Sequence, residues 1–179
     1  MLAKPHHMKG LKLFHPDYIA NTVYNIDFNY LQERGIKAVL IDLDGTVVSR
    51  ESFDVDKRIT NYLKKQSVEI YIATNRPKSR DLKDLKKLLN ARGVIHPVGV
   101  FMKPFPRYFK HAASTHQFKA SEVAMIGDRY LQDIFGANLA GFTTILVHKL
   151  GISKGFIDMH ISSIAKKRTD KLAARYISL

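Results

Sequence analysis

Four aspartates stand at or just after two short apolar segments of the chain. Asp42 and Asp44 end the first segment, and Gly45 follows with the backbone freedom to turn both carboxylates into one crevice. Asp128 ends a later apolar segment, and Asp133 lies five residues further on. Clustered carboxylates repel one another unless a cation lies among them. Because these candidate ligands are all oxygens, the natural cation is Mg²⁺.

Other polar residues follow the intervening apolar segments. Thr74 and Asn75 come at the end of the second segment, and Lys103 follows the third. In an open parallel sheet, ligands bind beyond the carboxyl ends of the strands, where loops and helix N-termini converge. We therefore expect these three residues to lie in the same crevice as the aspartates.

From about residue 36 onward, strand-length apolar segments alternate with amphipathic helical segments, which is typical of βαβ units. The predicted fold class is therefore α/β. The predicted strands are Lys37–Asp42, Val68–Thr74, Val94–Phe101, Val123–Asp128 and Thr143–His148. The predicted helices are Val55–Lys65, Lys78–Ala91, Pro106–His116 and Tyr130–Ala140. Pro77 suits the first turn of the second helix, and Gly93 suits its end.

The length of 179 residues, with 45% apolar residues, favours one domain with a single core. We expect the core at about 36–148, a largely helical N-terminal extension at about 10–35 and a basic C-terminal tail at about 149–179. The tail has seven Lys and Arg residues against two Asp. No internal repeat or Pro/Ser-rich linker argues for a second domain.

The formal net charge of +13 favours anionic partners, either lipid or nucleic acid, although excess lysine can also serve solubility alone. The absence of cysteine excludes disulfides, thiolate metal sites and a cysteine nucleophile. The eight histidines are scattered, so they do not predict a zinc site. No apolar segment reaches the roughly 18 to 20 residues of a membrane span. We expect a soluble or peripheral protein of the cytoplasm.

The ordered set of motifs resembles that of the haloacid dehalogenase-like (HAD-like) phosphatases. The set consists of Asp42-Leu43-Asp44-Gly45-Thr46, then Thr74, then Lys103, then Gly127-Asp128 with Asp133. The resemblance covers about residues 37–148. It implies a three-layer Rossmann-like core in which helices flank a central parallel sheet, and it implies Mg²⁺ as the cofactor.

The resemblance also implies roles for the acidic residues. Asp42 would attack phosphorus and form an aspartyl-phosphate, which splits one difficult hydrolysis into two easier steps. Asp44 would protonate the leaving alcohol and then activate water. Asp128 would bind Mg²⁺ together with Asp42 and the backbone carbonyl of Asp44. Asp133 would hold the metal-bound waters or Lys103 in place.

The remaining motif residues would bind the phosphate. Thr74 and the backbone at Asn75 would donate hydrogen bonds to phosphate oxygens, and Lys103 would offset negative charge on the nucleophile and the transferring group. Taken alone, Thr74 is also explained as a strand-end threonine and Lys103 as a surface lysine. Their order and spacing favour the functional interpretation.

The spacing leaves no room for a cap domain, because 28 positions separate Thr46 from Thr74 and 29 separate Thr74 from Lys103. Among capless (class IIIA) members, the chain is similar to the YqeG-type branch, whose relatives include phosphatidylglycerophosphate phosphatases. The matching segments are Phe14-His15-Pro16-Asp17, Glu33-Arg34-Gly35-Ile36-Lys37, Lys103-Pro104 and Gly136-Ala137-Asn138.

This resemblance implies a lipid phosphatase that forms phosphatidylglycerol on the inner face of a membrane, where the basic tail would bind anionic phospholipid. The tail's apolar residues are equally explained by packing on the core or in a dimer. An alternative function keeps the phosphatase chemistry but acts on a soluble nucleotide, sugar phosphate or phosphoprotein. A nucleic-acid-binding module is a second alternative, supported by the net charge alone.

Overall fold

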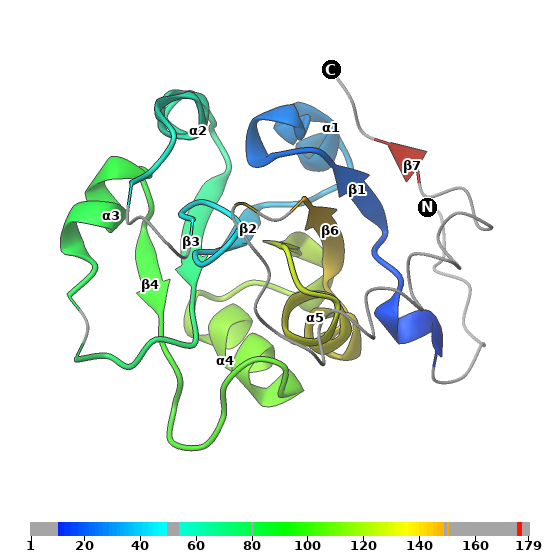
Figure 1. Ribbon diagram of the computed structural model, residues 1–179. Coiled ribbons are helices and arrows are strands. Elements are labelled where there is room, and N and C mark those ends of the chain that lie inside the picture. The colour runs from blue at the N-terminus through cyan, green and yellow to red at the C-terminus, as the bar shows by residue number, and fades with distance from the viewer. Residues whose placement is uncertain (1–10, 50–53, 80, 149, 151–174, 177–179) are drawn as a thin grey trace.

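The computed structural model describes residues 11–49, 54–79, 81–148, 150 and 175–176. Seven strands within this part of the chain form one parallel sheet in the order β4-β3-β2-β5-β6-β1-β7 (Figure 1). The strands are β1 (Tyr18–Ala20), β2 (Ala38–Asp42), β3 (Glu69–Ala73), β4 (Gly93–Ile95), β5 (Val123–Gly127), β6 (Thr143–Val147) and β7 (Arg175–Tyr176). The predicted α/β fold with a central parallel sheet is confirmed.

The central strands are buried on both faces, as parallel strands covered by helices must be. Every residue of β2 and β5 is buried. Along β2, Val39 and Ile41 belong to one hydrophobic cluster, whereas Ala38 and Leu40 belong to another. Because successive strand side chains point to opposite faces, these two clusters are the cores on the two sides of the sheet.

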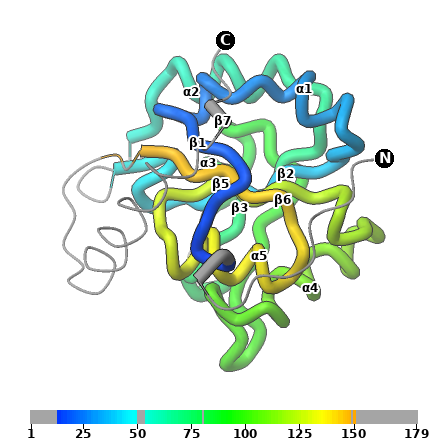
Figure 2. Tube along the Cα trace, turned by 90° about the vertical axis from the view of Figure 1, so that its right-hand side faces the viewer, coloured from blue at the N-terminus to red at the C-terminus, as the bar shows by residue number. Residues whose placement is uncertain are grey.

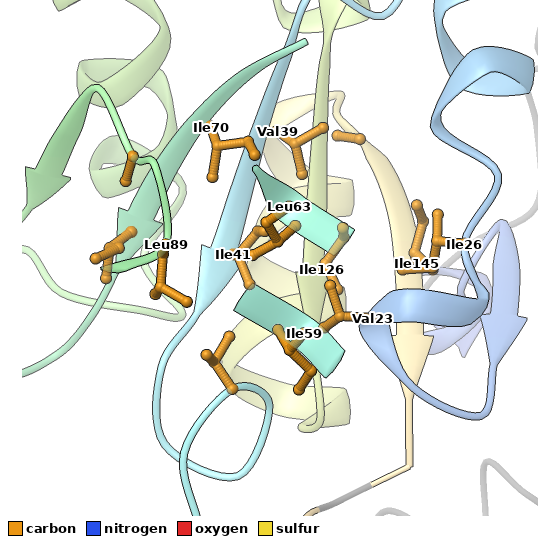
Figure 3. Close-up of a cluster of buried hydrophobic side chains, with 14 of the residues drawn as sticks. Val23, Ile26, Val39, Ile41, Ile59, Leu63, Ile70, Leu89, Ile126 and Ile145 are labelled. Carbon is orange, nitrogen blue, oxygen red and sulfur yellow. The ribbon is translucent and has the colours of Figure 1, made fainter. Parts of the chain in front are cut away.

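The helices α1 (Phe28–Glu33), α2 (Lys57–Leu63) and α3 (Lys83–Leu88) belong to the first face. Ile59 and Leu63 of α2 pack with Ile41 and Ile126 of the sheet, and Leu89 joins them from the end of α3 (Figure 3). Burying side chains of this size stabilises the fold by about 1.5 to 3 kcal/mol each.

The helices α4 (Pro106–Thr115) and α5 (Gly136–Ala140) cover the opposite face. Tyr108 and Phe109 of α4 and Ala137 of α5 pack in the second cluster, with Met125 of β5. Figure 2 shows α1 and α2 on one side of the sheet and α4 on the other. The three layers predicted for the core are therefore present.

The N-terminal extension corrects one prediction, because it is only partly helical. Tyr18–Ala20 is strand β1, which pairs with β6 through Tyr18 and Ile145. A 3₁₀ turn over Val23–Asn25 precedes α1, and the carboxylate of Asp27 caps α1 by accepting from the backbone N–H of Tyr30 at 3.1 Å. A Tyr-Ile-Ala segment has the propensity for a strand once β6 offers an unpaired edge.

Three predicted elements are shorter or differently wound than expected. The strand predicted over Val94–Phe101 ends at Ile95, before His96-Pro97 and the turn at Gly99. The helix predicted over Lys78–Ala91 begins at Lys83, so Pro77 lies outside its first turn. The helix predicted over Tyr130–Ala140 consists of a π-helical turn over Tyr130–Phe135 followed by α5.

Most of the predicted basic tail lies outside the described residues. Leu150 and β7 are its described parts, and β7 pairs in parallel with β1 at the edge of the sheet. Within the part of the chain that the structure describes, every helix is too short or too polar to cross a lipid bilayer.

Candidate active site

Asp42 is the last residue of β2 and enters the site from the centre of the sheet. It pairs in register with Ala73 of β3, and only 6% of its surface is exposed. The chain then turns sharply, because the N–H groups of Val47 and Val48 both donate to the carbonyl oxygen of Leu43. This turn holds Asp42 and Asp44 at the same edge of the sheet, as the sequence predicts.

Gly45 allows the turn to pass beside Asp128. Its φ of +93° is in the left-handed region that glycine adopts readily. A Cβ atom at this position would lie 2.6 Å from Oδ2 of Asp128. A larger residue would therefore strain the backbone and displace the carboxylate of Asp128.

Lys103 brings a positive charge between two buried carboxylates. Its Nζ donates to Oδ1 of Asp42 and, at 2.7 Å, to Oδ1 of Asp133. The exposed fractions of Lys103 and Asp133 are 2% and 0%. Such groups are stable in a protein interior only when they are paired.

Burial and charge act in opposite directions on the pKa values of this cluster. Burial raises the pKa of Asp42 to about 7, although Lys103 opposes the increase. Burial alone would lower the pKa of Lys103, but the negative charges of Asp133 and Asp42 outweigh it and raise that pKa. The two acids therefore favour the cationic form of Lys103, and a further cation beside Asp42 would favour the ionised carboxylate.

The side chain of Asn75 positions Lys103. The N–H of Lys103 donates to Oδ1 of Asn75 at 2.8 Å, and Nδ2 of Asn75 donates to the carbonyl oxygen of Lys103 at 2.9 Å. This pair of hydrogen bonds ties the loop that carries Lys103 to the end of β3. The phosphate contact expected of the Asn75 backbone stays a prediction.

Thr74 is 1% exposed and follows directly after β3. Its Oγ1 accepts from the backbone N–H of Arg76 at 3.1 Å, and its backbone N–H donates to the carbonyl oxygen of Ile95. The threonine hydroxyl thus shapes the turn after β3, and its contact with phosphate stays a prediction.

Asp128 completes a group of carboxylates that could hold a metal ion. One carboxylate oxygen from each of Asp42, Asp128 and Asp133 lies within 4.8 Å of the other two. An all-oxygen set of this kind fits Mg²⁺. The oxygens of Asp133 already accept from Lys103 Nζ and, at 3.2 Å, from the backbone N–H of Arg129. These contacts suit Asp133 to positioning Lys103.

Gly127 is required beside Asp133. A Cβ atom on Gly127 would overlap the side chain of Asp133. The glycine therefore lets the π-helical turn after β5 bring Asp133 back against the strand end.

Arg76 is a site residue that the sequence motifs do not predict. Its Nε donates to Oδ2 of Asp44 at 2.9 Å, and its Nη2 donates to Oδ1 of the same carboxylate. Both groups are partly buried, with 18% and 28% of their side chains exposed. The feature of the sequence that could have indicated Arg76 is its position, two residues after Thr74 at the end of a predicted strand.

The candidate site contains an open pocket of about 330 Å³. Its lining residues are Asp42, Asp44, Asn75, Lys103, Arg129 and Gln132. The sequence motifs do not predict Arg129 and Gln132 as site residues. Nη1 of Arg129 donates a hydrogen bond of 2.6 Å to Oε1 of Gln132. Two basic groups and two acidic groups therefore face a space large enough for a phosphate ester.

The sequence is similar to those of known hydrolases. Residues 100–155 match the model of the HAD-hydrolase-like family. The chain is 29% identical over 149 residues to "Probable phosphatase YqeG" of Bacillus subtilis, an alignment that covers 82% of this chain and 84% of the relative.

Two solved structures share the fold. A HAD-superfamily hydrolase from Geobacter sulfurreducens has a TM-score of 0.52 at 14% identity, covering 73% of this chain and 97% of that chain. A HAD phosphatase from Thermococcus onnurineus has a TM-score of 0.50 at 23% identity, covering 68% and 90%. Fold, motif order and sequence similarity agree, and the chain is similar to the HAD-like hydrolases in sequence and in fold.

Proposed function

We propose that this chain is a Mg²⁺-dependent phosphatase that hydrolyses phosphate monoesters through an aspartyl-phosphate on Asp42. The observation that carries the proposal is the buried Asp42–Lys103–Asp133 cluster, which opens into a pocket shared with Asp44. A carboxylate held beside a fixed cation at the base of an open pocket is suited to attack an anionic phosphorus centre.

In the first step, an oxygen of Asp42 bonds to phosphorus while the bond from phosphorus to the ester oxygen breaks. The departing oxygen takes a proton from Asp44. In the second step, Asp44 takes a proton from water, whose oxygen bonds to phosphorus and releases Asp42 and inorganic phosphate. Lys103 offsets the negative charge that gathers around the transferring group.

The metal-facing residues are Asp42, Asp128 and the backbone carbonyl of Asp44, and Asp133 holds Lys103. Mg²⁺ bound there would neutralise charge on the phosphate and on the attacking carboxylate. Thr74 and the backbone at Asn75 would donate hydrogen bonds to phosphate oxygens. Arg129 and Arg76 add positive charge at the pocket.

The proposed substrate is phosphatidylglycerophosphate, which would place the enzyme in the cytoplasm at the inner face of a membrane. Two features support a surface-bound substrate. The chain has one helix between β2 and β3 and one between β3 and β4, so the described part of these two intervals contains no cap domain. The net charge of +13 attracts anionic surfaces. The nearest alternative is a soluble phosphate monoester.

The test is phosphate release by the full chain from p-nitrophenyl phosphate and from phosphatidylglycerophosphate in mixed micelles. We expect activity with Mg²⁺ and none in excess EDTA. Asp42→Asn should lose activity by several orders of magnitude, whereas Asp54→Asn, at an exposed aspartate, should retain it. Wild-type turnover by Asp42→Asn would exclude Asp42 as the nucleophile. Turnover of soluble esters with no release from the lipid would exclude the lipid substrate.

A further inference from the structure

The loop between β4 and α4 exposes an unusual amount of apolar surface. Val98, Val100, Met102 and Phe105 are 49%, 74%, 40% and 52% exposed. They are four of the six large apolar side chains that are exposed in the described part of the chain. Single exposed apolar residues need no explanation, but a group of four on one loop marks an interaction surface. We call residues 98–105 the apolar loop.

A tight turn carries the most exposed of these side chains. The N–H of Val98 donates to the carbonyl oxygen of Phe101 at 3.0 Å, and the N–H of Phe101 donates back at the same distance. Gly99 has a φ of +58° and open space around it. Val100 therefore stands at the tip of the turn, where Asn, Asp or Gly is usual. Figure 1 shows the loop projecting from the body of the molecule below β4 and α4.

The apolar loop is fixed relative to the proposed active site because it also contains Lys103. Asn75 holds both backbone groups of Lys103, whose Nζ reaches Asp42. At the base of the loop, the rings of Phe101 and Phe105 meet edge to face with centroids 6.4 Å apart. Whatever binds the apolar residues is thereby brought to the mouth of the pocket.

No acidic residue lies near the apolar loop in the sequence, because the chain has none between Asp84 and Glu122. The exposed basic residues Arg107 and Lys110 follow the loop directly on α4. The guanidinium of Arg107 lies 4.9 Å from the ring centroid of Phe101, so charge and apolar surface are adjacent. Apolar side chains beside cations are the combination that binds the interface of an anionic bilayer.

A second copy of the chain is a poorer occupant of this surface. Each copy carries a net charge of +13, so bringing two such loops together costs electrostatic repulsion. Lysine is also depleted in protein–protein interfaces. An anionic lipid surface supplies the opposite charge and a layer into which Val100 and Phe105 can insert.

We propose that the apolar loop docks the protein on an anionic phospholipid bilayer and thereby presents the uncapped pocket to phosphate groups at that surface. The inference rests on the proposed function only for the identity of the reacting group. It assigns membrane contact to described residues beside the pocket, independently of the C-terminal tail.

Tryptophan fluorescence of the full chain tests the location directly, because the protein has no tryptophan of its own. Val100→Trp should shift its emission to the blue with vesicles of phosphatidylglycerol and phosphatidylcholine, and brominated lipid should quench it. Vesicles of phosphatidylcholine alone should cause no shift. Leu88→Trp is the matched control. Leu88 is 40% exposed in the last turn of α3, at the opposite end of the strands, and should show no shift.

Removing apolar surface tests the contribution of the loop. Val100→Ser with Phe105→Ser should weaken binding to the anionic vesicles at least tenfold, because each insertion removes a large apolar side chain from water. Leu88→Ser should bind as the wild type does. All three proteins should hydrolyse p-nitrophenyl phosphate at the same rate, since none of these side chains lines the pocket.

Three results would overturn the docking proposal: no shift for Val100→Trp, equal weakening by Leu88→Ser, or a wild-type dimer that the double variant dissociates in sedimentation. Hydrolysis of soluble esters without vesicle binding would refute the docking proposal but not the proposed phosphatase function. Vesicle binding without any phosphatase activity would support the docking proposal and refute the proposed phosphatase function.

Discussion

Replacing Lys103 with methionine removes the cation between two buried carboxylates while keeping most of the apolar stem. In the wild type, Nζ of Lys103 donates to Asp42 and Asp133, which are 6% and 0% exposed. At an effective dielectric constant of about 20, each contact is worth about 4 kcal/mol before desolvation is counted. Because the variant leaves both acids buried without that partner, we expect the free energy of unfolding to fall by about 3 to 5 kcal/mol.

The loss should depend on pH in a definite direction. Without Lys103, the pKa of Asp42 rises further above its unfolded value, because burial is no longer opposed by a positive charge. As pH rises, the unfolded chain releases this proton first, so unfolding becomes more favourable. The variant should therefore lose more stability at pH 8 than at pH 6.

Urea unfolding in EDTA, followed by circular dichroism, measures this loss. Lys110→Met, at an exposed lysine of α4, is the control and should change stability by less than about 0.5 kcal/mol. Added Mg²⁺ should stabilise Lys103→Met more than the wild type, because the ion takes over part of the neutralisation. A loss below about 1 kcal/mol at pH 8, with no added effect of Mg²⁺, would refute the buried charge cluster.

Three further changes probe neighbouring parts of the structure. Gly45→Ala should lower Mg²⁺ affinity by about tenfold or more in calorimetric titration, because its Cβ would press on the carboxylate of Asp128. Arg76→Ala should raise KM for p-nitrophenyl phosphate about tenfold with a smaller change in kcat, because it removes a charged hydrogen-bond donor near Asp44. Burial raises the pKa of Tyr71 to about 12, so stability should fall as pH rises from about 10 to 12, and Tyr71→Phe should flatten that slope in alkaline urea titrations.

The sequence predicts the sheet and the meeting of the acidic residues for one physical reason. Parallel strands buried on both faces are continuous apolar segments, and their carboxyl ends share one edge. Asp42 and Asp128 could therefore be placed together from the ends of two such segments, and the observed strands end at Asp42 and Gly127. The order of the motifs predicted further candidate site residues, such as Thr74 and Lys103.

Features that depend on tertiary partners could not be predicted in the same way. The three residues of β1 are too few to show a period, and they form a strand because the edge of β6 is available. The contact between Arg76 and Asp44 joins residues 32 positions apart, through side chains whose reach depends on the twist of two strands. Hydrophobic periodicity carries no information about such a contact.

The contact between Arg76 and Asp44 constrains how the proposed reaction begins. The guanidinium occupies both oxygens of Asp44, so this carboxyl can serve a leaving group only after the contact opens. A phosphate ester entering the pocket is an anion that competes for Arg76, and its binding energy can separate the pair. Substrate binding would then both place the phosphate beside Asp42 and free the acid that completes the step. Since the described residues between β2 and β4 contain no cap domain that could close over the substrate, this exchange of partners would be a local means of making the proposed acid available only when phosphate is present.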